Sequence, residues 1–337
     1  MISDIDYFKE DKKAKNNSGI SVAMCTCNGE LFLSEQLESI AKQTFLPDEL
    51  IICDDQSTDE TLKVVQDFQK KSPFNVKIYL NSSKLGSTKN FEKAISLCHE
   101  NIIVLSDQDD VWCPNKLERM ISVFKNYSKI GYLFSNAIIV DEKLQNSSFT
   151  IWERISFDFR QRKEYKQGQQ LKVLLKHNVV TGATIAFRAE LRKLILPIPE
   201  QWIHDAWIAL LLSAANIKGT FIEEPLIKYR QHSNQLIGTK RLTFNRQLDK
   251  AYHTKLDYYK QLSKSFEDVV SRLILMDKLN ANTELLIQSK IHHLNIRQMI
   301  HEVQYWQRWY WVFKEILNGR YNYFSNGCKS MAKDLFF

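Results

Sequence analysis

The sequence predicts an α/β fold: a mainly parallel, mixed sheet flanked by helices, followed by a C-terminal helical extension. Two observations carry this prediction. In the first third of the chain, short apolar runs alternate with amphipathic stretches, and the links between them suit strand–helix–strand crossovers. Beyond residue 239 the apolar residues recur every three or four positions, which is typical of packed helices.

Each early element has its own signal. Apolar runs of strand length occur at 20–24, 49–53, 76–80 and 102–105. Helices are expected between these strands near 31–43, 62–68 and 87–99. Ser57 or Thr58 is expected to cap the second of these helices, since a hydroxyl can accept a hydrogen bond from the first free backbone N–H groups.

Carboxylates gather after two of these strands. Asp54 and Asp55 follow the second strand, and Asp107, Asp109 and Asp110 follow the fourth. The carboxyl ends of parallel strands form the edge at which such sheets bind ligands. A divalent cation would offset the clustered charge and could also hold a diphosphate. The alternative is a solvated acidic turn, with Asp110 near a helix start.

Composition excludes several classes of protein. No Gly-x-Gly-x-x-Gly follows the first strand and no phosphate loop is present, which argues against the usual dinucleotide-binding and nucleotide-hydrolysing folds. No apolar run reaches the roughly 20 residues of a membrane span, the polar start lacks a signal-peptide core, and the six cysteines suit a reducing compartment. We therefore expect a cytoplasmic protein.

The net charge of +7 lies entirely in the C-terminal part. Residues 1–239 contain 30 Lys and Arg against 30 Asp and Glu, whereas residues 240–337 contain 16 against 9. If the protein meets an acidic surface, we expect the C-terminal part to meet it.

Three motifs in order, residues 20–28, 51–59 and 106–112, resemble glycosyltransferase family 2. The resemblance implies a Rossmann-like A-type (GT-A) nucleotide-diphospho-sugar transferase fold and transfer with inversion. The run Asp-Gln-Asp-Asp-Val-Trp, 107–112, is similar to the rhamnosyltransferase-like branch that builds bacterial surface polysaccharides.

The resemblance also implies roles for individual residues. Asp55 would bind the pyrimidine base, Asp107 would lie by the ribose, and Asp109 would bind the Mg or Mn that bridges the diphosphate. Cys27 departs from the family, which commonly has Tyr there, so base affinity or the choice between thymine and uracil would differ. Further residues on the nucleotide side would be Thr26, Lys89 and Gln108.

The middle of the chain would form the acceptor side. A strand is expected at 132–140 and another at 179–187, where Gly182 marks a close approach of the backbone and, in the family, the strand lies beneath the sugar. Residues 141–168 are polar and low in apolar content, so they form either a loop over the acceptor or a plain surface insertion.

His204 and Asp205 stand at the start of an apolar helix. Asp205 can be read as a helix cap or as the general base that accepts the proton of the attacking hydroxyl. The pair resembles the acidic catalytic motif of the family, which favours Asp205 as the base. His204 is expected to position or pack at the substrate side.

Arg230 and His232 follow a strand at 225–228. An arginine suits a diphosphate and a histidine suits a borderline metal such as Mn, although a lone histidine is usually structural. Because the segment resembles the Tyr-Arg-x-His end of the family's catalytic domain, His232 is assigned as a metal ligand and Arg230 as a diphosphate contact.

Helices are expected in the tail near 248–266, 283–294 and 297–317. The run 306–314 holds five aromatic residues with Arg308 and Lys314, a mixture that suits an anionic membrane interface. Packing in a homo-oligomer is the alternative. Nucleic acid is not expected, since no folded recognition module is present.

The sequence thus predicts a metal-dependent, inverting glycosyltransferase. The preferred donor is dTDP-β-L-rhamnose and the acceptor a lipid-linked saccharide or polysaccharide at the inner membrane face, as in O-antigen or capsule synthesis. The alternatives are transfer from a UDP-hexose or UDP-N-acetylhexosamine, a nucleotidyltransferase, and a non-catalytic nucleotide-sugar-binding scaffold. The predicted parts are a loose leader, 1–18; a catalytic domain, 19–238, with nucleotide and acceptor halves 19–115 and 116–238; and a helical region, 239–337.

Overall fold

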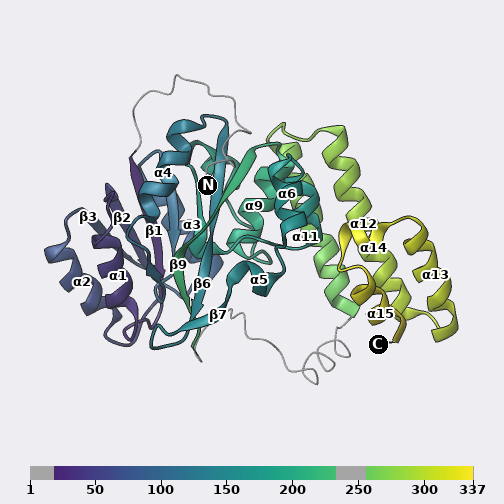
Figure 1. Cartoon of the computed structure of the whole chain (residues 1–337), viewed down its shortest axis with the longest axis horizontal. Coiled ribbons are helices and arrows are strands. Elements are labelled where there is room, and N and C mark those ends of the chain that lie inside the picture. The colour runs from purple at the N-terminus through teal and green to yellow at the C-terminus, as the bar shows by residue number, and fades with distance from the viewer. Residues whose placement is uncertain (1–18, 233–255, 337) are drawn as a thin grey trace. The chain divides into compact units, whose positions relative to one another are not determined.

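A computed structural model describes residues 19–232 and 256–336, which belong to two compact units (Figure 1). The predicted leader and the predicted boundary between 238 and 239 lie outside the described residues. The second unit also takes in 159–179 and 213–216, which the predicted catalytic domain includes. The remaining described residues before 233 form the first unit.

Four parallel strands make one half of the sheet in the first unit, in the order β3-β2-β1-β4. They are β1 (Ile20–Thr26), β2 (Glu49–Asp54), β3 (Asn75–Leu80) and β4 (Ile102–Ser106). Each coincides with a predicted strand. The register places Thr26 beside Asp54 and Met24 beside Ser106. The carboxyl ends of β1, β2 and β4 therefore meet at one edge, as predicted.

Helices link these strands: α1 (Leu33–Ala41), α2 (Thr61–Lys71) and α3 (Ser87–Leu97). The apolar face of α1 is buried through Leu33, Leu37 and Ile40. The predicted cap of α2 is wrong. Helix α2 begins after Glu60, and the Ser57 hydroxyl donates instead to the Asp54 carboxylate at 2.6 Å. A hydrogen bond to a buried carboxylate is stronger than one between a hydroxyl and a backbone N–H at a helix end.

Beyond β4 the sheet becomes mixed and continues in the order β8-β6-β9-β5, with β7 paired to β6. Strand β8 is antiparallel to both β4 and β6, β9 is parallel to β6, and β5 is antiparallel to β9. The strands are β5 (Val111–Trp112), β6 (Ile130–Val140), β7 (Asn146–Thr150), β8 (Ile185–Arg188) and β9 (Lys218–Arg230). The helices of this half are α4 (Lys116–Asn126), α5 (Ile151–Ile155), α8 (Arg192–Ile195), α9 (His204–Ala214) and the short 3-10 turn η2 (Ala189–Leu191).

Two predictions for this half are wrong. The strand expected over 179–187 begins only at Ile185, since Gly182–Thr184 form a 3-10 turn, η1. The segment 141–168 is not a single loop or a plain surface insertion: residues 141–150 are on the surface, whereas the residues after them are partly buried. It contains β7, α5 and α6 (Phe159–Lys166), and Trp152 is buried with its ring centroid 5.2 Å from that of Phe221. The apolar residues of this segment are few but large, so the low apolar content did not predict that some of them are buried.

The second unit is helical. Besides α6 it contains α7 (Gln170–Lys176), α11 (Leu256–Leu275), α12 (Ala281–Glu302), α13 (Tyr305–Leu317), α14 (Arg320–Phe324) and α15 (Cys328–Phe336). The helix predicted over 297–317 is wrong. Helix α12 ends at Glu302, and a second helix, α13, begins after Gln304, which forms a capping box with Gln307. Residues 248–255 of another predicted helix lie outside the described residues.

None of the helices in the described part of the chain is long and apolar enough to cross a membrane. The helical unit instead has a charged interior. Asp334, which is fully buried, accepts hydrogen bonds from Arg297 Nε at 2.6 Å, from Arg297 Nη2 at 2.8 Å and from the Tyr321 hydroxyl at 2.8 Å. A second buried pair joins His293 Nδ1 to Glu315 Oε2 at 2.6 Å. These bonds connect α12, α13, α14 and α15.

Replacing Asp334 by Asn should therefore destabilise the helical unit. Burial raises the pKa of Asp334, but hydrogen bonds from His301 and Arg297 outweigh it and hold that pKa below its usual value. The carboxylate thus stabilises the fold above the unfolded-state pKa of about 3.9 and ceases to do so as the pH falls through the lower folded-state value. We expect Asp334→Asn to lower the unfolding free energy at pH 7 by about 3 kcal/mol.

Urea unfolding followed by circular dichroism at several pH values would measure this loss. Glu267→Ala, at an exposed position of α11, is the matched control and should change the unfolding free energy by less than about 0.5 kcal/mol. Equal stability of Asp334→Asn and the wild type would show that the buried pair contributes nothing net.

Candidate active site

The site is built first at the ends of β1 and β2. The Thr26 hydroxyl donates to Asp54 Oδ2 at 2.7 Å, and the backbone N–H of Ser57 donates to Asp54 Oδ1 at 2.8 Å. Thr26 and Asp54 are both buried. Thr26, predicted on the nucleotide side, thus lies at the edge where the carboxyl ends of β1, β2 and β4 meet, and it fixes the turn that carries Asp55. We call this edge, with Asp55, Asp107 and Asp109, the crevice.

Asp55 holds the loop that precedes α3. Its carboxylate accepts hydrogen bonds from Asn81 Nδ2 at 2.8 Å, from the backbone N–H of Leu85 at 2.7 Å and from that of Gly86 at 2.8 Å. These bonds use three of about four acceptor positions on a carboxylate. Gly86 has a φ of 77°, which a residue with a Cβ rarely adopts. Asp55 therefore shapes this side of the crevice.

Gln108 ties the end of β4 to the loop after β1. Its Oε1 accepts from the backbone N–H of Cys27 at 2.8 Å, and its Nε2 donates to the Cys27 carbonyl at 3.0 Å. Both ends of the amide are therefore bound to the protein backbone. The structure gives Gln108, predicted as a nucleotide contact, the geometry of a positioning residue.

Asp109 and His232 meet at the crevice although 123 residues separate them. Asp109 Oδ2 lies 2.8 Å from His232 Nε2, and the His232 ring packs on Phe32 with centroids 4.8 Å apart. Among residues 19–232 and 256–336, no three His, Cys, Asp or Glu side chains converge as a complete metal site. The two predicted ligands are thus together, and an ion held here needs further oxygen atoms from a ligand.

Arg230 binds the loop that carries Asp109 and Asp110. Its side chain is 1% exposed, its Nε donates to the Asp109 carbonyl at 2.8 Å, and its other guanidinium nitrogens donate to Glu35 and to the Glu142 carbonyl. Its backbone N–H donates to Asp110 Oδ1 at 3.1 Å. Each guanidinium nitrogen has a protein acceptor, so the structure makes Arg230 a positioning residue and differs from the predicted diphosphate contact.

Asp205 lies in the first turn of α9 and is held by another element. Its Oδ2 accepts a hydrogen bond from the backbone N–H of Gly182 at 2.8 Å, and the residue is 9% exposed. Because this bond fixes the orientation of the carboxylate, Asp205 does more than begin its own helix. The Gly182 N–H that donates this hydrogen bond belongs to the first residue of the turn η1.

His204 is buried against the same glycine. A Cβ at position 182 would lie 2.5 Å from His204 Nε2, so only glycine fits there. The ring of His204 stacks on Phe91 with centroids 4.0 Å apart, and burial lowers its pKa to about 3. His204 is therefore neutral at physiological pH and packs beneath Gly182, in agreement with the packing role expected for it.

Electrostatics link Asp205 to the acidic cluster after β4. The pKa of Asp107 is raised to about 7, first by burial and then by the negative charges of Asp109 and Asp205. The pKa of Tyr229 is raised by its own burial, then by the charge of Asp110 and by those of the same three carboxylates. Asp107, Asp109 and Asp205, separated by up to 98 positions, therefore act on one another across a single crevice.

Lys116 is a residue of the site that sequence reasoning missed. It is fully buried, its Nζ donates to the Ala183 carbonyl at 2.9 Å, and it lies 3.5 Å from the centroid of the Trp112 ring. Burial lowers its pKa, and the carboxylates of Asp110 and Asp107 oppose that effect. A signal was available, because Lys116 falls on the apolar face of α4, with Leu117 and Met120.

Lys89, predicted on the nucleotide side, has protein partners. Its Nζ donates to Glu92 Oε2 at 2.8 Å and to the Ile198 carbonyl at 2.6 Å. It lines a cavity of about 370 Å³ at the start of α3, together with Gly86 and Glu200. The cavity adjoins the loop that Asp55 holds, so Lys89 borders the site without pointing a free ammonium into it.

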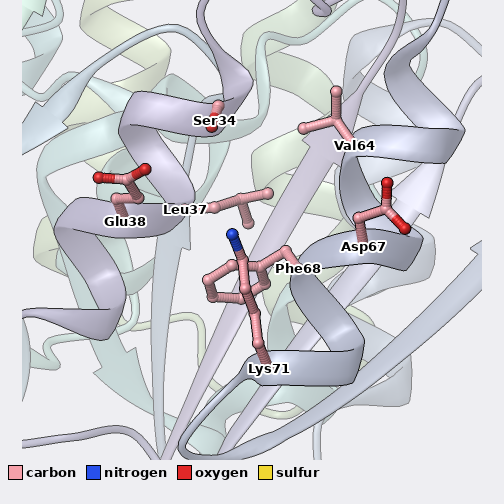
Figure 2. Close-up of a pocket in the computed structure, with 7 residues that line it drawn as sticks. All are labelled: Ser34, Leu37, Glu38, Val64, Asp67, Phe68 and Lys71. Carbon is pink, nitrogen blue, oxygen red and sulfur yellow. The ribbon is translucent and has the colours of Figure 1, made fainter.

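A second cavity, of about 210 Å³, lies between α1 and α2, where Leu37 and Phe68 face each other (Figure 2). Glu38, Asp67 and Lys71 surround its rim. It contains none of the predicted site residues, so we do not assign it to the active site.

Comparison with known proteins identifies the family of the chain. The family model described as Glycosyl transferase family 2 matches residues 21–194. The dTDP-rhamnosyl transferase RfbG of Shigella flexneri is 29% identical over 230 residues, which are 64% of this chain and 73% of that protein. The UDP-Glc:alpha-D-GlcNAc-diphosphoundecaprenol beta-1,3-glucosyltransferase WfgD of Escherichia coli is 29% identical over 139 residues, which are 41% of this chain and 53% of that protein.

Solved structures share the fold at low identity. The S. aureus TarS 1–349 structure in complex with UDP-GlcNAc aligns with a TM-score of 0.56 at 15% identity and covers 90% of this chain and 93% of that one. The mannosyltransferase PcManGT from Pyrobaculum calidifontis, in complex with GDP-Man and Mn²⁺, aligns with a TM-score of 0.52 at 14% identity and covers 91% and 79%. The GT-A type of fold is thereby confirmed, and with more than half of its length matched by the family model, the chain belongs to glycosyl transferase family 2.

Proposed function

We propose that this glycosyltransferase moves a sugar, with inversion, from a nucleoside diphosphate donor to a saccharide acceptor, with Asp205 as the general base. The observation that carries the proposal is the hydrogen bond from the Gly182 N–H to Asp205 Oδ2, 2.8 Å long, which orients this carboxylate beside the acidic crevice. The mutual effect of Asp107 and Asp205 supports their proximity.

In the proposed reaction, the acceptor hydroxyl attacks the anomeric carbon from the face opposite the diphosphate. Its proton passes to Asp205 as the new C–O bond forms and the bond to the diphosphate breaks. A single displacement of this kind inverts the anomeric configuration. Neutral His204 beneath Gly182 keeps a second charge away from the base.

Asp109 and His232 fit a divalent cation, Mg or Mn. A carboxylate oxygen and an imidazole nitrogen 2.8 Å apart are an acceptable pair of ligands for such an ion. When bound, the cation would stabilise negative charge on the departing diphosphate. The presence of Mn²⁺ together with GDP-Man in the PcManGT complex supports this assignment.

For the nucleotide, Asp55 is the proposed contact to the base, with Thr26 beside it and Asp107 by the ribose. Gln108 and Arg230 are proposed to act indirectly, by holding the loops that carry Cys27 and Asp109. Lys89 is proposed to border the nucleotide from the start of α3.

The preferred donor is dTDP-β-L-rhamnose, which would give an α-L-rhamnosyl linkage. The similarity to RfbG supports it. WfgD, which is named for UDP-Glc, and TarS, which was solved with UDP-GlcNAc, favour a UDP-hexose or UDP-N-acetylhexosamine as the second candidate. The diphosphoundecaprenol in the name of WfgD supports a lipid-linked acceptor. We propose with it a role in surface polysaccharide synthesis at the cytoplasmic face of the membrane. A non-catalytic scaffold would bind the donor but be indifferent to the loss of Asp205.

Asp205→Asn separates the base from its structural role. The amide oxygen can still accept from the Gly182 N–H, but the side chain no longer accepts a proton. We expect the transfer rate to fall about a hundredfold to ten-thousandfold while donor affinity stays within about twofold. Single-turnover transfer and donor binding by calorimetry would measure the two effects. Asp67→Asn, on the exposed face of α2, is the control, and full activity of Asp205→Asn would refute the assignment of the base.

Thermal stabilisation by nucleotide sugars tests the metal and the donor together. We expect Mn²⁺ with dTDP-rhamnose to raise the melting temperature of the wild type, because a ligand that binds only the native state stabilises it. His232→Ala should lose the part of the shift that depends on Mn²⁺, whereas His292→Ala, at an exposed position of α12, should keep it. A shift with UDP-sugars alone would discard rhamnose, and an unchanged Mn²⁺ response in His232→Ala would discard this ligand.

Lys116→Met tests whether the turn η1 matters for catalysis. The variant keeps the length of the side chain but loses the hydrogen bond to the Ala183 carbonyl, next to the glycine that orients Asp205. We expect kcat to fall about tenfold with a smaller change in the KM for the donor. Lys125→Met, exposed on the same helix, should leave both constants unchanged. A fall in donor affinity alone would place Lys116 with the nucleotide instead.

A further inference from the structure

Helix α13 exposes a row of large apolar and aromatic side chains. Six of them are between 51% and 72% exposed: Tyr305, Trp306, Trp309, Tyr310, Phe313 and Leu317. Their spacing of one, three and four positions places them along one face of the helix. In Figure 1, α13 lies at an edge of the helical unit. A surface patch of this kind marks a docking site more often than an accident of folding.

The opposite face of α13 fixes how the helix is turned. Val312 is buried in a cluster with Ile300 and Tyr321. Glu315, also buried, is bound by His293 Nδ1 at 2.6 Å and by Arg320 Nη1 at 2.8 Å. Because these contacts hold the helix by its other side, the aromatic face is not a core face that has turned outward.

The charged side chains that residues 303–336 expose to solvent have a single sign. Residues 303–336 contain five basic side chains, at 308, 314, 320, 329 and 333, and two acidic ones. Both acidic side chains, Glu315 and Asp334, are buried and paired with basic groups. All charged side chains that this stretch shows to solvent are therefore positive, and the partner they suit is anionic.

We propose that the aromatic face of α13 docks on the interface of an anionic lipid bilayer. Trp and Tyr rings place an apolar body among acyl chains and a polar edge at the headgroups, and Lys314 would meet anionic headgroups from the flank of the helix. A second copy of the chain fits less well, because a self-complementary contact would bring like charges together. The inference deepens the proposed function, since it locates the surface on which a lipid-linked acceptor would be met.

Vesicle binding by the full chain tests this surface without any sugar transfer. Sedimentation with vesicles of phosphatidylcholine, with and without phosphatidylglycerol, should show binding that needs the anionic lipid and weakens as salt is added. Replacing Trp306, Trp309 and Phe313 by Ser should weaken binding by roughly tenfold or more. The matched control replaces three equally exposed side chains, Ile274, Leu275 and Leu285, by Ser and should bind as the wild type does.

Each other outcome overturns the proposal. Failure of the wild type to bind the anionic vesicles would do so, and so would equal binding by the α13 variant and the wild type. If the wild type is a dimer that does not bind vesicles, and the α13 variant is a monomer, the face would be assigned to a second copy. Because donor stabilisation is measured separately, a wild type that responds to Mn²⁺ and donor but does not bind the anionic vesicles would reject this inference and leave the proposed function standing.

Discussion

Three carboxylates within four residues of the end of β4 set the constraint on which the catalytic unit depends. Asp107, Asp109 and Asp110 are held with little access to water, and like charges so placed would cost several kcal/mol without opposing groups. The chain brings two buried basic side chains to the cluster. Arg230 binds the loop through both its backbone and its guanidinium, and Lys116, whose pKa is lowered by burial, approaches from α4. The pKa of Asp107 is nevertheless raised to about 7, because burial and the charges of Asp109 and Asp205 outweigh the effect of Lys116.

This requirement accounts for the mixed half of the sheet. Strand β9 ends at Arg230, and its pairing with β5 places that arginine under the acidic loop. Strand β8 follows the turn η1, which receives the hydrogen bond of Lys116 and gives one to Asp205. The elements after β4 are thus arranged around the carboxylates that follow this strand. The same set of contacts holds the proposed base.

The helical unit buries ion pairs beside its apolar core and exposes aromatic side chains. Its interior holds Arg297, Asp334, His293 and Glu315, while the aromatic side chains of α13 lie outside. Buried ion pairs are poor sources of net stability but specify how helices meet. Hydrogen bonds between α12, α13, α14 and α15 therefore fix the orientation of α13, and its aromatic face remains available for contact.

The sequence alone determined the parallel strands, the family and the pairing of acidic clusters, because strand patterns and strand order are local and a sheet edge brings the carboxyl ends together. Tertiary structure decided what the individual polar side chains do. Gln108 and Lys89 look equally suited to a nucleotide by residue type, but partners 81 and 109 positions away, Cys27 and Ile198, engage them. The burial of Lys116 and the contact of Asp205 with Gly182 likewise depend on elements distant in the chain, and no local pattern specifies hydrogen bonds of that range.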